Sequence, residues 1–352
     1  MPSGANYEKP VDRSTIIAKM RFHNGDAKGE KMPDLELTAA FGDYDRTNIL
    51  KMGSVRPEGV NLRVLSLPPT EIFFRMCRYQ EFDLSEMSMG AHMFLLGQGE
   101  SPFVGMPAFP SRVFRHSMVY ANADANVDAV ADLNGKRVAI REWGMTAVVW
   151  IVGILAEEYG LDVGSVDWVA AIEPRVPIPM PPGARIRYMK PGQTVSNMLE
   201  SGEVDGALIH QVPECFSKGS PHVKRLFPDY KAAEIDYYKR TGVHPMMHCV
   251  VLRKDVHEQN PWALQSIYRA MCEAREKTME FLSDNGALSA MIPFLPSVMD
   301  ETREIFGDDF WPYGVEANCT SLEKLLSYAH AQGLTPGLLE VEDLFGKSVL
   351  TT

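Results

Sequence analysis

The sequence has few cysteines, no long apolar run and no basic tract, and each of these absences argues against a class of protein. Its five cysteines are scattered, with no CxxC pair, which disfavours a disulfide framework or a zinc–thiolate site. No apolar run approaches the roughly 20 residues of a membrane span. The formal charge is −11, from 35 basic and 46 acidic residues, whereas nucleic-acid binding needs a basic stripe. We therefore predict a cytoplasmic protein with neither a membrane nor a nucleic acid as its partner.

Two common catalytic motifs are also missing. The sequence contains no Gly-rich phosphate-binding motif, which argues against a nucleotide cofactor. It contains no Gly-x-Ser-x-Gly elbow, which argues against a serine hydrolase. Residues 1–33 are polar and lack the apolar core of a secretory signal. We predict that residues 1–34 form a polar N-terminal extension, either flexible or draped over the surface.

From Leu35 onward, strand patterns alternate with helix patterns. Leu35–Phe41 alternates apolar and polar residues as a strand does, and residues 145–159 form an amphipathic helix that stops at Gly160. A chain of 352 residues has room for two compact domains or two lobes. The sequence therefore predicts an α/β protein with largely parallel sheets.

The densest group of functional side chains lies between Pro107 and Ser117. Arg112, Arg115 and His116 fall within five residues, just after an apolar run. Arginine presents a planar fork of donors to a carboxylate, and histidine exchanges a proton near neutral pH. The cluster is either a pocket for a small organic anion or a basic surface loop held in ion pairs.

Other polar side chains also follow predicted strands, and ligands of open α/β sheets bind beyond the carboxyl ends of strands. The candidates outside the cluster are Arg46, Ser88, Glu142, Trp143, Thr146, His210, Glu214, His244 and His248. The start of the helix at Thr146 attracts anions, unless its hydroxyl only caps the helix. Trp143 either stacks on an aromatic ligand or packs inside the protein.

Three of the remaining histidines have neighbours that suggest chemistry. His210 precedes Glu214, and a histidine near a carboxylate suits a general acid, although a structural histidine fits as well. His244 and His248 have the i,i+4 spacing of metal ligands. Pro245 makes this segment a poor helix, and two histidines are a weak metal signature. We predict no metal site; a divalent ion, if bound, would take histidine and carboxylate ligands.

Several runs of residues occur in an order typical of one family. They are Asp43-Tyr-Asp-Arg-Thr47, Glu71-Ile-Phe-Phe-Arg-Met76, Phe109-Pro-Ser-Arg-Val-Phe-Arg-His-Ser117, Asp132-Leu-Asn-Gly-Lys-Arg-Val138, Met145-Thr-Ala-Val-Val-Trp150 and Pro245-Met-Met-His248. In these runs the chain resembles the 4,5-dihydroxyphthalate decarboxylase family, over roughly residues 35–352. It departs from the family pattern in the long extension, in Glu142-Trp-Gly and in His244, so the resemblance bears more firmly on the fold than on the substrate.

The resemblance implies a two-lobed fold like that of type II periplasmic binding proteins, with a ligand cleft between the lobes. One lobe would combine residues 35–122 with 248–352, and the other would hold residues 123–247. The implied reaction is non-oxidative decarboxylation of a hydroxylated aromatic acid, from 4,5-dihydroxyphthalate to 3,4-dihydroxybenzoate and CO2. We expect no cofactor, a small aromatic carboxylate as substrate, and a homo-oligomer.

This reaction assigns roles to the candidates. Arginines would hold the carboxylates, an acid would protonate the ring carbon, and a base would take the phenolic proton. Carboxylate binding goes to Arg46, Arg112 and Arg115, with Ser88, Trp143, Thr146 and His244 as further substrate contacts. The proton donor is His116 or His248, and the base that takes the phenolic proton is Glu142, His210 or Glu214. The alternative is a solute-binding protein without catalysis, since the same fold and arginines would serve it.

Overall fold

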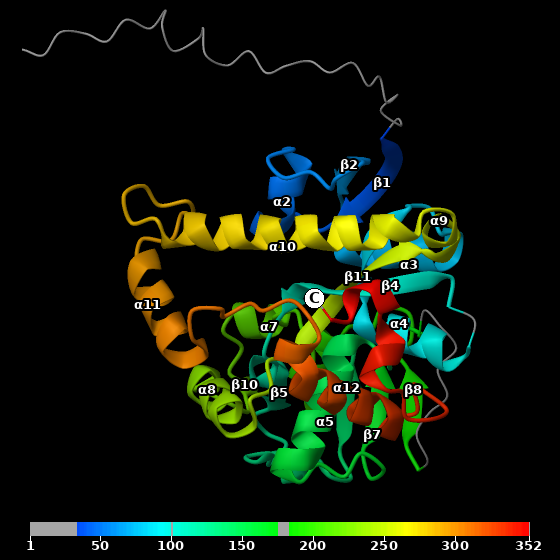
Figure 1. Ribbon diagram of the computed structural model, residues 1–352. Helices are drawn as coiled ribbons and strands as arrows, with labels where there is room; N and C mark the ends of the chain where they lie inside the picture. Colours follow the sequence, from blue (N-terminus) through cyan, green and yellow to red (C-terminus); the bar gives the residue numbers. More distant parts are fainter. Residues whose placement is uncertain (1–33, 100, 175–182, 352) are drawn as a thin grey trace, which may run out of the picture. The chain divides into compact units, whose positions relative to one another are not determined.

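The computed structural model describes residues 34–99, 101–174 and 183–351 (Figure 1). The predicted extension therefore lies outside the described residues, apart from Asp34, as does most of the Pro-rich loop near residue 180. Leu35–Thr352 forms one compact unit. Two β-sheets organise this unit.

The first sheet has the spatial order β2-β1-β3-β11-β4. Its strands are β1 (Leu35–Phe41), β2 (Val60–Ser66), β3 (Leu84–Ser88), β4 (Phe103–Arg112) and β11 (Met246–Arg253). β2 and β3 run parallel to β1, whereas β11 runs antiparallel to both β3 and β4. Every residue of β3 is buried, as expected for a strand in the middle of a sheet that is covered on both faces.

The second sheet has the spatial order β10-β5-β9-β6-β7-β8. Its strands are β5 (Val119–Asn122), β6 (Arg137–Ile140), β7 (Asp167–Ala170), β8 (Arg185–Tyr188), β9 (Gly206–Leu208) and β10 (Val223–Arg225). β6 to β9 run parallel to one another, and β5 is antiparallel to β9 and β10. Both sheets are therefore mixed, but in each only one strand runs against the others: β11 in the first sheet and β5 in the second. The predicted parallel direction holds for the remaining strands.

The mixed order arises because the chain passes from one sheet to the other twice. β5 joins the second sheet soon after β4 leaves the first, and β11 returns to the first sheet after α8 (Tyr230–Thr241). A strand that arrives without a βαβ crossover is not required to run parallel to its neighbours. The exact lobe boundaries at residues 122 and 247 stay a prediction.

Helices surround the sheets, and their ends follow local signals. α5 begins at Thr146 and stops at Gly160, whose φ of 73° is the left-handed conformation that glycine adopts readily. The α-helices besides α8 are α2 (Asp45–Lys51), α3 (Pro69–Tyr79), α4 (Met89–Gly97), α5 (Thr146–Tyr159), α6 (Val195–Glu200), α7 (Glu214–Ser217), α9 (Lys254–Gln259), α10 (Pro261–Ser283), α11 (Leu295–Phe306) and α12 (Cys319–Ala331). Short 3-10 turns are η1 (His116–Met118), η2 (Val130–Leu133), η3 (Glu316–Asn318), η4 (Val341–Leu344) and η5 (Lys347–Val349).

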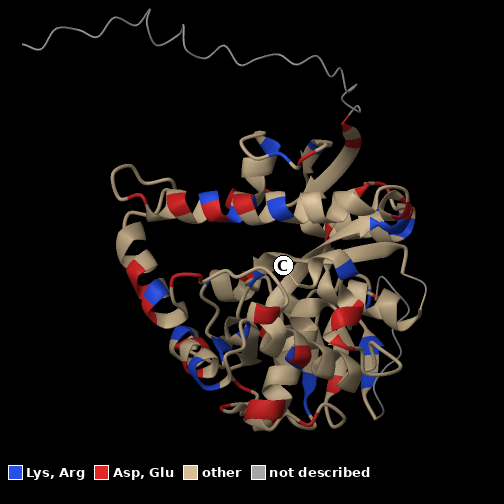
Figure 2. Ribbon diagram, in the orientation of Figure 1, with Lys and Arg blue, Asp and Glu red and all other residues tan. Residues whose placement is uncertain are grey.

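Acidic and basic residues are interspersed along the long helix α10 (Figure 2). This mixture is typical of a solvated helix face held by i,i+4 pairs, such as Lys277 with Glu273 at 2.8 Å. Among the helices of the described residues, none is both long and apolar enough to cross a membrane.

Candidate active site

A cavity of about 290 Å³ lies where elements of the two sheets meet. The first sheet and its neighbouring helices contribute α3, the start of α4, β11 and the end of β4. The second sheet contributes the loop after β6, the start of α5 and the loop after β9. The lining residues are Pro69, Thr70, Phe73, Cys77, Ser88, Ala91, Ser111, Arg115, Glu142, Gly144, Met145, Thr146, Ala147, His210, Met247 and His248. Half of the predicted site residues are among them.

The first turns of α4 and α5 meet at this cavity. Ser88 caps α4, and its hydroxyl lies 2.9 Å from the hydroxyl of Thr146, which also accepts a hydrogen bond from the Gly90 N–H at 2.9 Å. The approach needs glycine, because a Cβ at position 90 would lie 2.4 Å from the carbonyl oxygen of Gly144. Two helix N-termini at one cavity favour a bound anion through the positive ends of their dipoles, and the first turn of α5 has no side-chain cap.

Arg115 brings a cation to the same cavity. Its Nε lies 3.3 Å from the sulfur of Met247, which is a weak acceptor. Burial lowers the pKa of Arg115 to about 10, partly opposed by the negative charge of Glu234. The guanidinium therefore stays charged at neutral pH and gains most from a carboxylate partner.

His248 faces the cavity from β11. Its Nδ1 lies 2.9 Å from Oε2 of Glu86, a carboxylate of β3 with no exposed surface. The edge of the imidazole packs against Phe73, with ring centroids 4.7 Å apart. Glu142 and His210 line the cavity as well, so the site contains the residue types for general acid and base chemistry.

The backbone at His248 is irregular, and the cause lies in β4. His248 pairs with Ser111 and with Ser88, but the β11–β4 register shifts on both sides of His248. β4 contains Pro107 and Pro110, which have no N–H to donate to the ladder. Bulges of this kind re-aim side chains and occur often beside active sites.

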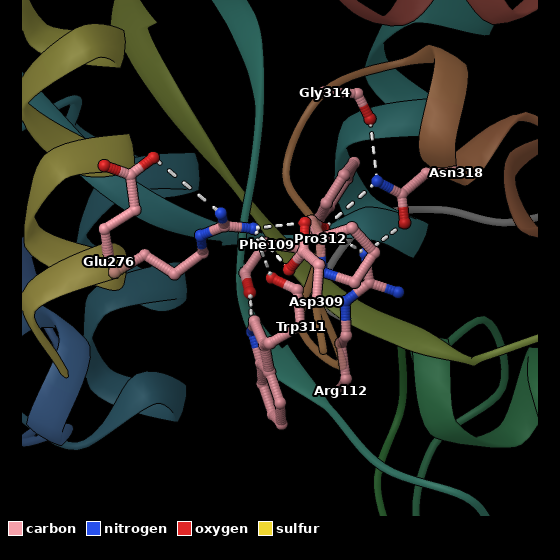
Figure 3. A network of polar contacts seen from close by, with 9 residues as sticks. Phe109, Arg112, Glu276, Asp309, Trp311, Pro312, Gly314 and Asn318 are labelled. Atoms are coloured by element: carbon pink, nitrogen blue, oxygen red, sulfur yellow. Dashed lines mark hydrogen bonds and ion pairs between the residues drawn. The ribbon is translucent and has the colours of Figure 1, made fainter. Parts of the chain in front are cut away.

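Arg112 lies outside the cavity, although it is the first arginine of the predicted cluster. β4 extends to Arg112, so Ser111 and Arg112 point to opposite faces of the strand, and Ser111 takes the cavity side. The Arg112 guanidinium donates to the carbonyl oxygen of His244 at 3.1 Å. It also donates to the Pro312 carbonyl at 2.8 Å and to Oδ1 of Asn318 (Figure 3). Its donors hold the C-terminal segment in place, so we assign it no substrate contact.

His116 and His244 also lie outside the cavity. His116 is fully buried among Tyr159, Phe227 and Tyr237. Burial, together with the charge of Arg240, lowers its pKa to about 4. His244 stacks on a phenylalanine, with ring centroids 5.1 Å apart and planes 10° from parallel. Burial, and after it the charge of a nearby arginine, lowers its pKa to about 3. Both imidazoles are neutral at pH 7 and pack as aromatic rings.

Three further predicted residues contact protein groups elsewhere. Trp143 is buried against Trp168, and its Nε1 donates to the Gln332 carbonyl at 3.3 Å. Glu214 is exposed and pairs with Lys218 at 2.5 Å. Arg46 donates from Nε to the Pro110 carbonyl at 2.6 Å, and its guanidinium lies over the rings of Tyr44 and Trp311.

The two histidines with metal-like spacing do not converge, because His244 turns to Phe114 and His248 turns to Glu86. Within the described ranges, no group of three or more histidine, cysteine, aspartate or glutamate side chains is arranged to hold a metal ion.

Glu86 is the clearest residue that the pattern of strand ends does not identify, because it lies inside β3 and not after it. The available signal was a carboxylate within the strand Leu84–Ser88, whose other residues are apolar or small. A carboxylate in such a strand is costly to bury unless specific donors surround it. Phe73, Ser111 and Met247 were missed for a simpler reason, since no strand-end rule applies to them.

The chain was compared with known proteins by sequence and by structure. No family profile matches it. It is 36% identical over 321 residues to a 4,5-dihydroxyphthalate decarboxylase of Comamonas testosteroni, which covers 89% of this chain and 97% of that protein. A protein of the same name from Pseudomonas putida is 34% identical over 215 residues, or 59% of this chain and 83% of that protein. The chain belongs to the 4,5-dihydroxyphthalate decarboxylase family.

Membership in the decarboxylase family confirms the predicted resemblance and the predicted enzyme class. The fold has a solved counterpart in the periplasmic sulfonate-binding protein SsuA of Methylobacillus flagellatus. The two share 17% identity and a TM-score of 0.54, over 91% of this chain and 93% of that one. This likeness confirms the two-lobed, periplasmic-binding-protein-like fold. In the run Glu142-Trp-Gly, where the chain departs from the family pattern, Glu142 and Gly144 line the cavity, whereas Trp143 does not; His244, the other departure, also lies outside it.

Proposed function

We propose that the chain catalyses non-oxidative decarboxylation of a hydroxylated aromatic acid, with 4,5-dihydroxyphthalate as the first substrate to test. The products would be 3,4-dihydroxybenzoate and CO2. The observation that carries this proposal is one cavity that combines Arg115, two helix N-termini and His248 around an apolar wall. The names of the two relatives support the substrate.

The size and lining of the cavity suit a single aromatic ring. Ligand pockets range from about 300 to 1,000 Å³, so about 290 Å³ is at the small end and favours one ring over a fused system. Phe73, Met145, Ala147 and Met247 supply apolar surface for the ring faces. Polar groups lie around this wall at separate points, as a ring with several polar substituents requires.

The anionic substituents have two sets of partners. Arg115 would bind one carboxylate, since a guanidinium matches it with two parallel hydrogen bonds. The first turns of α4 and α5, with the hydroxyls of Ser88 and Thr146, would bind the other. A dicarboxylate that meets both sets is held in one orientation, and orientation accounts for a large share of enzymatic rate enhancement.

The chemistry needs a proton delivered to carbon. Each carboxylate of the substrate is para to a hydroxyl, so the ring carbon that bears it is electron-rich. A proton passes from Nε2 of His248 to that carbon, the carbon–carboxyl bond breaks, and its electron pair restores the aromatic ring as CO2 leaves. Glu142 or His210, which line the same cavity, would accept the phenolic proton. This proton transfer uses no electron acceptor, so it needs no redox cofactor, and we propose that the side chains of the cavity suffice for it.

A panel of hydroxybenzoates and hydroxyphthalates tests the proposal, with turnover followed by ultraviolet absorbance and CO2 release. We expect turnover of 4,5-dihydroxyphthalate, unchanged by a chelator. Binding without turnover across the panel would favour the alternative, a solute-binding protein. Arg115→Met should raise KM by about 10²-fold, the cost of losing a charge-assisted pair. The matched control, Arg112→Met, should leave KM unchanged because Arg112 lies outside the cavity.

The predicted cytoplasmic location and homo-oligomer belong to the same proposal. All five cysteines are free thiols, as is usual in a reducing compartment. Light scattering of the purified protein measures the oligomeric state.

A further inference from the structure

Glu86 is a carboxylate without exposed surface that receives three donors. The Gly42 N–H donates to its Oε1, while the Tyr44 hydroxyl at 3.2 Å and Nδ1 of His248 at 2.9 Å reach its Oε2. A buried carboxylate is costly unless it is paired and hydrogen-bonded. These contacts satisfy it, and one of them is with the residue that reaches the cavity.

The contact with Glu86 determines which nitrogen of His248 faces the cavity. Nδ1 is bound by Glu86, and Phe73 packs against the ring at a centroid distance of 4.7 Å. Within the described residues, no protein group forms a hydrogen bond with Nε2 of His248. Glu86 and Phe73 therefore fix the orientation of the ring, and Nε2 is the nitrogen that can contact a ligand.

We propose that Glu86 is the positioning residue for His248, holding the N–H on Nδ1 so that Nε2 is the atom that exchanges a proton with the substrate. This inference rests on the proposed function. An ionised carboxylate only accepts hydrogen bonds, so it selects the neutral tautomer with the proton on Nδ1. When Nε2 also carries a proton, Glu86 remains the acceptor for Nδ1–H. Donation from Nε2 to the ring carbon then leaves the same tautomer, ready to be protonated again at Nε2.

Tyr44 and Gly42 support this arrangement. A Cβ at position 42 would lie 2.4 Å from the ring of Tyr44, so glycine there allows the phenol to reach Glu86. The Arg46 guanidinium lies over the same ring, 4.5 Å from its centroid. Burial, and after it the charge of Glu86, raises the pKa of Tyr44, so the hydroxyl stays protonated and donates. Arg46 thus acts on the site through Tyr44 and not through the substrate.

Steady-state kinetics of Glu86→Gln test the role. An amide can turn its NH2 toward Nδ1 and favour the other tautomer. We expect kcat to fall on the order of 10²–10³-fold, with KM within about threefold of wild type, since Glu86 does not line the cavity. Glu86→Asp, which keeps a carboxylate, should recover about tenfold over Glu86→Gln. The matched control is Asp83→Asn, which removes the carboxylate that Thr38 contacts at 2.8 Å on the same sheet; it should leave kcat unchanged.

Nitrogen NMR of the histidine rings reads the tautomer without any turnover. The signals of His248 are identified by their loss in His248→Gln. In the wild type we expect the proton of the neutral ring on Nδ1, and in Glu86→Gln a shift toward Nε2. An unchanged tautomer, or a kcat of Glu86→Gln within about threefold of wild type, would overturn the inference. If the wild type turns over no hydroxyphthalate, the proposed function fails while the NMR result still decides the role of Glu86. Tyr44→Phe, which removes one donor, provides a milder test should Glu86→Gln not fold.

Discussion

Replacing His116 with phenylalanine should flatten the dependence of stability on pH. The imidazole is fully buried, with its centroid 5.7 Å from the ring of Tyr159, 5.2 Å from Phe227 and 5.5 Å from Tyr237. Among the described residues, neither of its ring nitrogens has a hydrogen-bond partner. A phenyl ring therefore fits the chemistry of the site and should change the unfolding free energy at neutral pH by only about 1 kcal/mol.

The magnitude follows from the pKa of His116, which burial lowers from 6.5 to about 4. The unfolded chain takes up this proton below pH 6.5, but the folded protein does so only below about pH 4. Stability from the neutral ring is thus complete above pH 6.5 and is lost as the pH falls toward 4. At about 1.4 kcal/mol per pKa unit, the loss amounts to about 3 kcal/mol.

Urea unfolding at about pH 7.5 and about pH 4.5 measures this loss. Between these conditions the wild type should lose about 2–3 kcal/mol more unfolding free energy than His116→Phe. His222→Phe is the control, because His222 is exposed and paired with Asp124 at 2.8 Å; it should alter the difference by less than about 1 kcal/mol. Equal pH dependence in wild type and His116→Phe would refute the reasoning. A loss of turnover in His116→Phe at neutral pH would instead indicate that His116 takes part in catalysis.

Three further substitutions test the roles of residues in and around the cavity. Gly90→Ala would place a methyl group 2.4 Å from the Gly144 carbonyl oxygen, which should push α4 away from α5. We expect KM to rise about 10–100-fold in initial-rate assays. Burial raises the pKa of Glu234 to about 7, and the negative charge of Glu234 opposes the positive charge of Arg115. Because Glu234 ionises as the pH rises through about 7, KM for a dicarboxylate should rise over this range and should not change with pH in Glu234→Gln. Arg112→Met should lower the unfolding free energy by about 3 kcal/mol, because it removes three hydrogen bonds that the buried guanidinium donates.

The sequence predicts the strands and helices of this chain well, because their patterns are local. Leu35–Phe41 forms β1 as its alternation predicts, and α5 stops at Gly160. The rule that polar residues after strands gather at one edge also holds for Ser88, Thr146 and His210. What local patterns do not contain is the direction of pairing, which depends on where the chain changes sheets.

The differences between the predicted site residues and those that line the cavity come from tertiary packing. Arg112 and Arg115 look equivalent in the sequence, but pairing with Met246 extends β4 to Arg112 and turns its side chain away from the cavity. His116 looks reactive until rings from distant parts of the chain surround it. Glu86 could have been proposed from its burial cost alone. The contact between Glu86 and His248 could not be predicted, since the two residues meet only when β11 pairs with β3.

In the proposed mechanism, His248 is the residue that distinguishes a decarboxylase from a binding protein of the same fold. The anion contacts come from Arg115 and the first turns of α4 and α5, and a solute-binding protein would need the same groups. The proposed proton donor comes from a separate element, β11, at the point where its pairing with β4 is irregular. His248→Gln should therefore bind a hydroxyphthalate with an affinity within about threefold of wild type and fail to turn it over, as calorimetry and absorbance would show. A variant that loses binding together with turnover would mean that His248 holds the substrate in addition to protonating it.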